Sequence, residues 1–215
     1  MLRKIIKSFI PNRGEIFFDL FIQGVKNIHS CTSILGDMIN GQRFRSRRML
    51  VEQLQHKQKK AINIDKNIIS ELDKQLLTPI DRGDIFSLSK IILRFVRQII
   101  KINKKIEIYN IDKNTNNCLT DSVLSLQNIT TTLCDLLTAL KSNDEKKLQI
   151  AAEYIAELDK NIIEELEAVI DTEKQTENNF LLMMKIKEVF KLVEGVVTAS
   201  AVLCDFVMRI HIKEI

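Results

Sequence analysis

Apolar residues recur at steps of three and four along almost the whole chain, which is the spacing of one face of an α-helix. In the first such segment, residues 15–39, they are Phe18, Phe21, Ile22, Val25, Ile28, Leu35 and Ile39. The 215 residues include only 6 glycines and 2 prolines, too few for the frequent turns of a sheet-rich fold. Because 45% of the residues are hydrophobic and 28% are charged, the chain can bury a core and keep a solvated surface. The sequence therefore predicts an all-α protein.

Breaks in this pattern divide the chain into six expected helices. They cover approximately residues 15–39, 47–77, 79–109, 121–140, 145–173 and 180–215. Thr78 is expected to cap the third helix, with Pro79 at its first position. Asp112–Thr120 is expected to be a polar linker, and Ser142–Glu145 a capping box that opens the fifth helix.

The two halves of the chain match each other when one is shifted by 101 residues. The shift aligns apolar residues of all three helices, for example Val25 with Leu126 and Ile92 with Val193. We interpret this as an internal repeat of two tandem three-helix bundles, residues 1–112 and 113–215. Antiparallel packing would bury the apolar stripes within each bundle.

Charge is distributed unevenly between these halves. Residues 1–113 carry 22 lysines and arginines against 11 aspartates and glutamates, a net charge of +11, whereas residues 114–215 carry 10 against 17, a net of −7. This asymmetry indicates either different partners for the two halves or attraction between them. It argues against nucleic-acid binding by the whole chain, because phosphates would repel the acidic half.

Several expected signals are missing, and their absence predicts a cytoplasmic protein. The longest run without a charged residue, Ser122–Cys134, has 13 residues, fewer than the roughly 20 that cross a bilayer. Lys7 and Pro11 leave no apolar core for a signal peptide. The cysteines form no CxxC pair, so each is expected to be a buried thiol in a reducing compartment: Cys31, Cys118, Cys134 and Cys204.

One motif resembles that of a known family. The segment Leu77–Ile85 (LTPIDRGDI) is similar to the T-P-x-D-R-x-D-I signature of PhoU-like proteins, although Gly83 stands where an acidic residue is usual. The segments Phe17–Phe21 and Ile210–Lys213 resemble the N-terminal and C-terminal segments of one branch of this family. The proteins of that branch are accessory proteins associated with PiT-type phosphate transporters. The resemblance spans nearly the whole chain. It implies six helices in two three-helix bundles, and a regulatory role in phosphate transport.

The resemblance also implies paired acidic motifs, E/D-x-x-x-D, on the second and third helices of each repeat. Carboxylates at positions i and i+4 share a helical face and can hold one cation. Counting from the motif places these pairs on Gln58/Ile62, Leu93/Arg97, Asp159/Ile163 and Glu194/Thr198. Only Asp159 and Glu194 keep a carboxylate, so we expect no cofactor and at most a weak divalent-metal site. Glu167 and Asp171 satisfy the motif in a second-ranked alternative register.

Two groups of basic residues are candidate partner sites. Lys90, Arg94, Arg97, Lys101 and Lys104 form a stripe on the third helix, for which a solvated face is the favoured interpretation. The alternative is an anion-binding surface for a partner's acidic loop or for the acidic half of this chain, with Arg94, Arg97 and Lys101 as its main residues.

Arg43, Arg45, Arg47 and Arg48 cluster at the turn between the first two expected helices. They are expected to be exposed, or else to contact anionic lipid or a transporter loop through Arg43 and Arg45. No aromatic residues interleave them, which argues against single-stranded nucleic acid.

The sequence contains no recognisable catalytic motif. His29, His56 and His211 are isolated and are expected to be surface or hydrogen-bonded residues, and no phosphate-binding loop, nucleophile elbow or HExxH occurs. Asp81, Arg82 and Asp84 lie at an expected helix start, where capping and an Arg–carboxylate clamp explain them together with Thr78 and Pro79. We therefore expect a protein that is not an enzyme.

Three functional hypotheses remain. The first is a non-enzymatic cytoplasmic regulator, peripheral at the inner membrane, that contacts a membrane phosphate transporter on its cytoplasmic face or an associated sensor. The second is a divalent-metal-binding protein that uses Asp159 and Glu194. The third is a metal-free helical adaptor. Homo-oligomerisation is left open by the sequence.

Overall fold

We describe residues 15–40, 47–111, 117–173 and 180–214 of a computed structural model of the chain. Within these ranges the chain forms six α-helices and no strand, which confirms the predicted all-α class. The helices are α2 (Glu15–Ile39), α3 (Arg47–Lys74), α4 (Arg82–Tyr109), α5 (Asn117–Ser142), α6 (Glu145–Glu173) and α7 (Phe180–Glu214).

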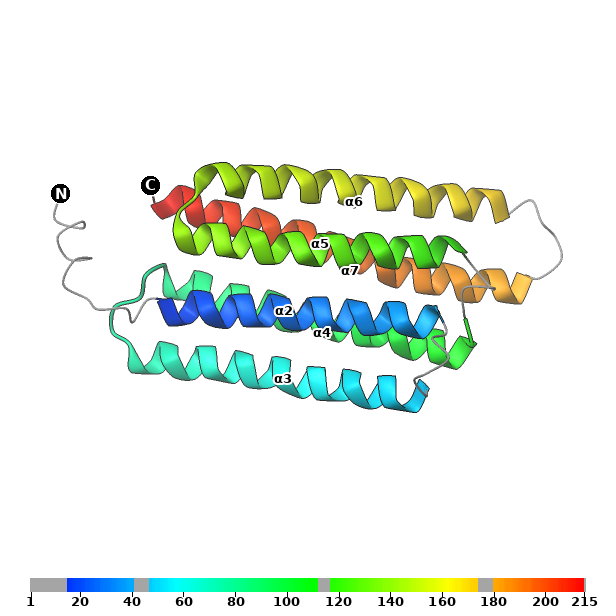
Figure 1. Cartoon of the computed structure of the whole chain (residues 1–215), viewed down its shortest axis with the longest axis horizontal. Coiled ribbons are helices and arrows are strands. Elements are labelled where there is room, and N and C mark those ends of the chain that lie inside the picture. Colours follow the sequence, from blue (N-terminus) through cyan, green and yellow to red (C-terminus); the bar gives the residue numbers. More distant parts are fainter. Residues whose placement is uncertain (1–14, 41–46, 112–116, 174–179, 215) are drawn as a thin grey trace.

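The helices lie roughly along one axis in four layers (Figure 1). α3 and α6 form the outer layers, and the pairs α2/α4 and α5/α7 lie between them. Helices α2, α3 and α4 contact one another, as do α5, α6 and α7. The two groups meet through α2 against α5 and α4 against α7. The boundaries 1–112 and 113–215 remain a prediction, because residues 112–116 lie outside the described ranges.

α2 and α5 are in contact at a pair of residues separated by the 101-residue offset. His29 Nδ1 lies 3.1 Å from Thr130 Oγ1, and these two residues are 101 positions apart. A second contact, between Thr32 and Thr130 hydroxyls at 3.2 Å, is fully buried in the same interface.

The turn between α3 and α4 differs from the expectation. α3 ends at Lys74, and α4 begins at Arg82. Asp81 is the N-cap, because its Oδ1 accepts hydrogen bonds from the backbone N–H groups of Gly83 at 2.8 Å and Asp84 at 3.1 Å. Thr78 instead donates its hydroxyl to the Ile80 carbonyl at 2.7 Å. The prediction of a Thr78 cap with Pro79 at the first helical position was therefore wrong.

The turn between α5 and α6 also has a different cap. Ser142 ends α5 and donates to the Ala139 carbonyl at 3.2 Å, so it is not part of a capping box. The Lys147 N–H donates to Asp144 Oδ1 at 3.2 Å, which makes Asp144 the capping side chain of α6. Asn143 adopts φ = 54° and reverses the chain between the two helices. α5 itself begins at Asn117, within the expected linker.

A glycine allows α2 and α4 to approach closely. A Cβ atom on Gly24 would lie 2.7 Å from Ile92 Cγ2. The largest fully buried side chains come from both groups of helices, and they include Phe17, Phe21, Phe95 and Phe190. The core is thus continuous from one group to the other.

One described segment, Leu119–Ser142, is long and apolar enough to cross a membrane by length and composition alone. Half of its most apolar window is buried inside the bundle, and a core helix of a soluble protein passes the same test. The position of α5 between α2, α6 and α7 explains its apolar composition.

Candidate functional site

Arg82 of the family-like motif ties the turn to the end of α3. Its guanidinium donates to the Gln75 carbonyl at 2.6 Å and to the Leu72 carbonyl at 2.7 Å. Carbonyl groups in the last turn of a helix have no partner within the helix, so a forked donor is suited to this position. The expected Arg–carboxylate clamp was wrong, because Arg82 binds main-chain oxygens instead.

Asp84 links the same motif to the other group of helices. It is buried, and the Lys213 ammonium donates to its carboxylate at 2.6 Å. Asp84 lies in the first turn of α4, whereas Lys213 lies in the last turn of α7. Together with the Asp81 cap, these contacts give the motif residues structural roles at one end of the bundle.

Asp159, a candidate metal ligand, is buried on α6 against α7. Its Oδ1 accepts a hydrogen bond from the Ser200 hydroxyl at 2.9 Å, while Oδ2 has no hydrogen-bond partner among the described residues. Burial raises the pKa of this carboxyl to about 6, the Ser200 hydrogen bond acts in the opposite direction, and repulsion from Asp205 adds to the rise.

Glu194, the other candidate ligand, is not brought to Asp159. It is exposed on α7, and the Thr198 hydroxyl donates to its backbone carbonyl at 3.0 Å. Ser200, the partner of Asp159, lies in contrast on a buried position of α7. Among the side chains that the structure describes, no group of three or more His, Cys, Asp or Glu could hold a metal ion. Glu167 and Asp171, the alternative register, lie outside those side chains.

The first group of helices contains a buried carboxylate that the sequence analysis missed. Asp65 on α3 accepts a hydrogen bond from the Ser89 hydroxyl at 2.8 Å. It also forms an ion pair with Lys90 at 2.8 Å. The Lys90 cation thus compensates the buried charge of Asp65, whereas the described contacts of Asp159 include no cation. Asp65 lies between Ala61 and Ile68 on the buried face of its helix, at the i+4 and i+3 spacing, a signal that the sequence analysis could have used.

The histidines and cysteines of the described part of the chain lie in several different environments. His29 is hydrogen-bonded to Thr130 and His56 is exposed. His211 is buried, and neither of its ring nitrogens is hydrogen-bonded to a described residue. Burial raises the pKa of the Cys31 and Cys204 thiols to about 12, which keeps them protonated at neutral pH. The expectation that the histidines are surface or hydrogen-bonded residues thus fails for His211.

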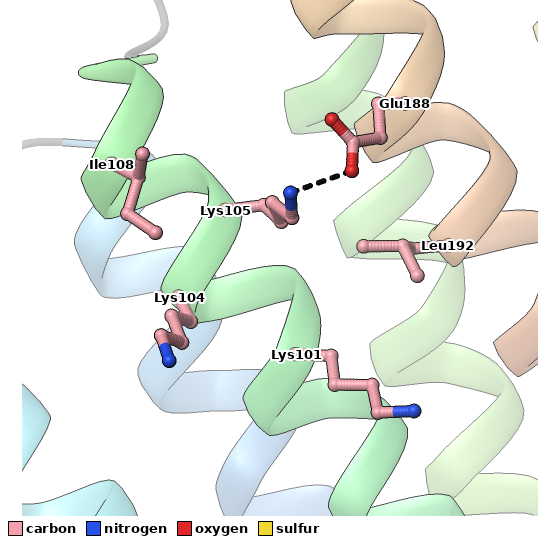
Figure 2. Close-up of a pocket in the computed structure, with 6 residues that line it drawn as sticks. All are labelled: Lys101, Lys104, Lys105, Ile108, Glu188 and Leu192. Carbon is pink, nitrogen blue, oxygen red and sulfur yellow. Dashed lines mark ion pairs between the residues drawn. The ribbon is translucent and has the colours of Figure 1, made fainter.

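The basic stripe on α4 is only partly available to a partner. Lys90 is engaged by Asp65 and lies 5.0 Å from the Phe86 ring centroid. Arg94, Arg97 and Lys101 are exposed and form no ion pair with any described residue. Figure 2 shows Lys101 extending from α4 toward α7.

The arginine cluster divides between described and undescribed residues. Arg43 and Arg45 lie outside the described ranges, so their proposed contacts stay predictions. Arg47 donates to Asn110 Oδ1 at 3.0 Å and to the Ile111 carbonyl at 3.4 Å, where it joins the start of α3 to the end of α4. Arg48 pairs with Glu52 on the exposed face of α3.

This arrangement of layered helices defines an all-α, PhoU-like fold. A PhoU-like protein from Shewanella oneidensis MR-1 superimposes with a TM-score of 0.80 at 10% sequence identity, over 92% of this chain and 99% of the other. A second protein from the same organism, described as a "putative PhoU-like phosphate regulatory protein", gives a TM-score of 0.78 at 10% identity with the same coverage. No protein-family model and no curated protein sequence matches this chain. The predicted fold class is confirmed.

Proposed function

We propose that this protein is a non-enzymatic regulator of phosphate transport that acts by contact with a membrane phosphate transporter, at its cytoplasmic face, or with an associated sensor. The observation that carries the proposal is the PhoU-like fold, which spans 92% of the chain and is shared with a protein described as a phosphate regulatory protein. The motif and terminal segments that resemble the PiT-associated branch point to that class of transporter.

The chemistry of the described side chains favours contact over catalysis. The motif residues Asp81, Arg82 and Asp84 are engaged in caps and an ion pair, so they are not free to act on a substrate. The cations Arg94, Arg97 and Lys101 are instead exposed and unpaired with described residues, as a docking surface requires. Such surfaces mainly set the orientation and rate of association.

A transporter loop of acidic character would complement this surface. The basic half of the chain carries a net charge of +11 and includes α4. In this proposal the protein works in the cytoplasm and binds at the periphery of the inner membrane, through its transporter partner and without nucleic acid.

Membrane pull-downs at low and high salt test the proposal. We expect the purified protein to retain the phosphate transporter or its sensor, and an R94E/R97E variant to retain at least about tenfold less at low salt. The matched control is K59E/K60E, which makes the same charge change at two exposed positions on α3. Equal retention of all three proteins, or no transporter in any of them, would contradict the proposal.

The metal-binding alternative has one supporting observation, the unpartnered Oδ2 of buried Asp159. A metal held there would survive dialysis and would be lost in Asp159→Ala. We expect less than about 0.1 equivalent of iron, zinc, nickel or manganese after dialysis, since one carboxylate beside Ser200 supplies too few oxygens for a tight site. Stoichiometric metal that depends on Asp159 would favour the alternative.

A metal-free adaptor unrelated to phosphate would bind neither transporter nor sensor in the pull-down.

A further inference from the structure

We propose that a groove between α4 and α7 binds an acidic segment of a partner protein that also carries apolar side chains. This inference deepens the proposed function and rests on it in taking the partner to be a protein. The groove is a hollow of about 300 Å³ lined by Lys101, Lys104, Lys105, Ile108, Glu188 and Leu192 (Figure 2).

Lys105 of α4 and Glu188 of α7 form an ion pair across the groove. Lys105 Nζ lies 2.6 Å from Glu188 Oε1, and the Tyr109 hydroxyl donates to the same carboxylate. The hydrogen bond to Glu188 raises the pKa of Lys105, and the bond from Lys105 lowers the pKa of Glu188, so both groups are charged at neutral pH. The pair joins α4 to α7 and leaves neither group free for a ligand.

The remaining charges at the groove are positive. Lys101 and Lys104 are exposed, and neither forms an ion pair with the described residues. Lys185 lies 5.7 Å from the Tyr109 ring centroid, beside Glu188, and adds a further cation. Because Lys105 neutralises the one lining carboxylate, a ligand here meets a net positive surface. Charge complementarity therefore selects an acidic partner.

The groove is also apolar, which distinguishes it from a simple anion site. Ile108 is 60% exposed at its edge, and Leu192 lines it from α7. Leu181 and Met184, which are 63% and 54% exposed, share the helical face of Glu188 and extend the apolar surface along α7. Exposed apolar side chains next to a hollow are typical of a site that receives side chains of a partner.

Two other anionic ligands fit this surface less well. Inorganic phosphate could contact the lysines, which form only part of the lining. It would leave the apolar side chains of Ile108 and Leu192 without a partner. A bilayer would present a flat array of headgroups, whereas the groove is concave. An acidic segment with apolar side chains matches both the lysines and the apolar lining, so we commit to that occupant.

Titration of the full chain with synthetic peptides of about 16 residues, followed by amide NMR shifts, tests this inference. The probe peptide carries Glu and Leu at helical spacing, and two control peptides replace every Leu by Ser or every Glu by Lys. Inorganic phosphate and vesicles with about 30% phosphatidylglycerol are the other two probes. We expect the Glu/Leu peptide alone to bind, with shifts at residues 101–108 of α4 and 188–192 of α7.

Variants separate the groove from a general charge effect. K101E/K104E is expected to weaken peptide binding at least about tenfold, and I108S to weaken it without changing charge. K59E/K60E carries the same charge change on α3, which does not contact α7, and should bind as the unmodified chain does. All these positions are exposed, so the variants should fold. Amide spectra of the free variants check this point.

Each other outcome overturns the inference. Equal binding of the Ser-substituted peptide, or displacement by inorganic phosphate, would identify an anion site. Binding to vesicles but not to the peptide would identify a lipid surface. No peptide binding up to about 1 mM would show that the groove is not a docking site. Failure of the proposed function is distinguishable, because the peptide would still bind in the groove although the membrane pull-down retained no transporter.

Discussion

The ammonium group of Lys213, in the last turn of α7, lies 2.6 Å from the carboxylate of Asp84, in the first turn of α4. The side chain of Asp84 is 11% exposed, so its charge is mostly removed from water and depends on this partner. The pair joins the two groups of helices at the end of the bundle that carries the α3–α4 turn (Figure 1).

Replacing Lys213 by Met should lower the free energy of unfolding by about 1 kcal/mol, because it leaves the Asp84 carboxylate without its cation. Urea denaturation measures the change. Lys74→Met is the matched control, since Lys74 pairs with Glu71 on the surface of its own helix and its loss should have an effect below about 0.5 kcal/mol. Equal effects of the two variants would show that the Lys213 pair does not stabilise the bundle.

Arg82 should stabilise the fold more through the two hydrogen bonds of its guanidinium than through its charge. Arg82→Ala should lower the free energy of unfolding by about 1–2 kcal/mol, because it leaves the Leu72 and Gln75 carbonyls without their donors. Arg82→Lys keeps the charge but cannot reach both oxygens in the same geometry, so it should recover less than half of the loss. Full recovery by lysine in a denaturation experiment would contradict the structural role.

Gly24 and Gly36 should respond differently to alanine. At Gly24 the new Cβ would lie 2.7 Å from Ile92 Cγ2, a methyl group on a stiff β-branched side chain, so we expect a loss of about 1–3 kcal/mol. At Gly36 it would meet the end of the flexible Gln127 side chain at 2.6 Å, which can move away. The gain in helix propensity then makes Gly36→Ala neutral or stabilising by up to about 1 kcal/mol. Melting temperatures compare the two, and a stabilised G24A variant would contradict the close packing of α2 on α4.

Asp159 should make the protein less stable as the pH rises. Below about pH 4 the carboxyl is protonated in both the folded and the unfolded state. Between about pH 4 and the folded-state pKa of about 6, the unfolded state ionises first, so the folded state loses stability as the pH rises. Above that range the loss, about 1–3 kcal/mol, is complete.

Asp159→Asn removes this titration. We therefore expect the variant to gain about 1–3 kcal/mol relative to the unmodified chain when the pH is raised from 4 to 7. Urea denaturation at both pH values measures the difference. A D159N advantage that is the same at pH 4 and pH 7 would show that Asp159 does not titrate in this way.

Periodicity and composition were sufficient to predict the helices. α2 spans residues 15–39 and α6 spans 145–173, as expected, because long amphipathic segments leave little choice of structure. The turns were less predictable. Thr78, Asp81, Ser142 and Asp144 are all suitable caps, and the sequence does not show which of them faces a free N–H group. Tertiary contacts such as that of Arg82 with α3 decide between them.

The candidate site could be predicted from the sequence only where all its residues lie on one helix. Arg94, Arg97 and Lys101 share a face of α4, so spacing alone indicates a common surface. The Lys105–Glu188 pair joins α4 to α7, and no local pattern identifies a contact between residues on distant helices. Asp159 and Glu194 occupy matching motif positions on two helices, so the sequence predicted that they would lie together. The structure does not bring their carboxylates together, because Asp159 is buried and Glu194 is exposed.

Phosphate uptake in the cells that produce this protein tests the central claim most directly. Labelled phosphate uptake should change at least about twofold when the protein is removed, and re-expression of the unmodified chain or of K59E/K60E should restore it. R94E/R97E, which reverses two exposed charges of α4, should fold but fail to restore uptake. Uptake that is identical with and without the protein, across low and high external phosphate, would contradict a regulatory role in phosphate transport.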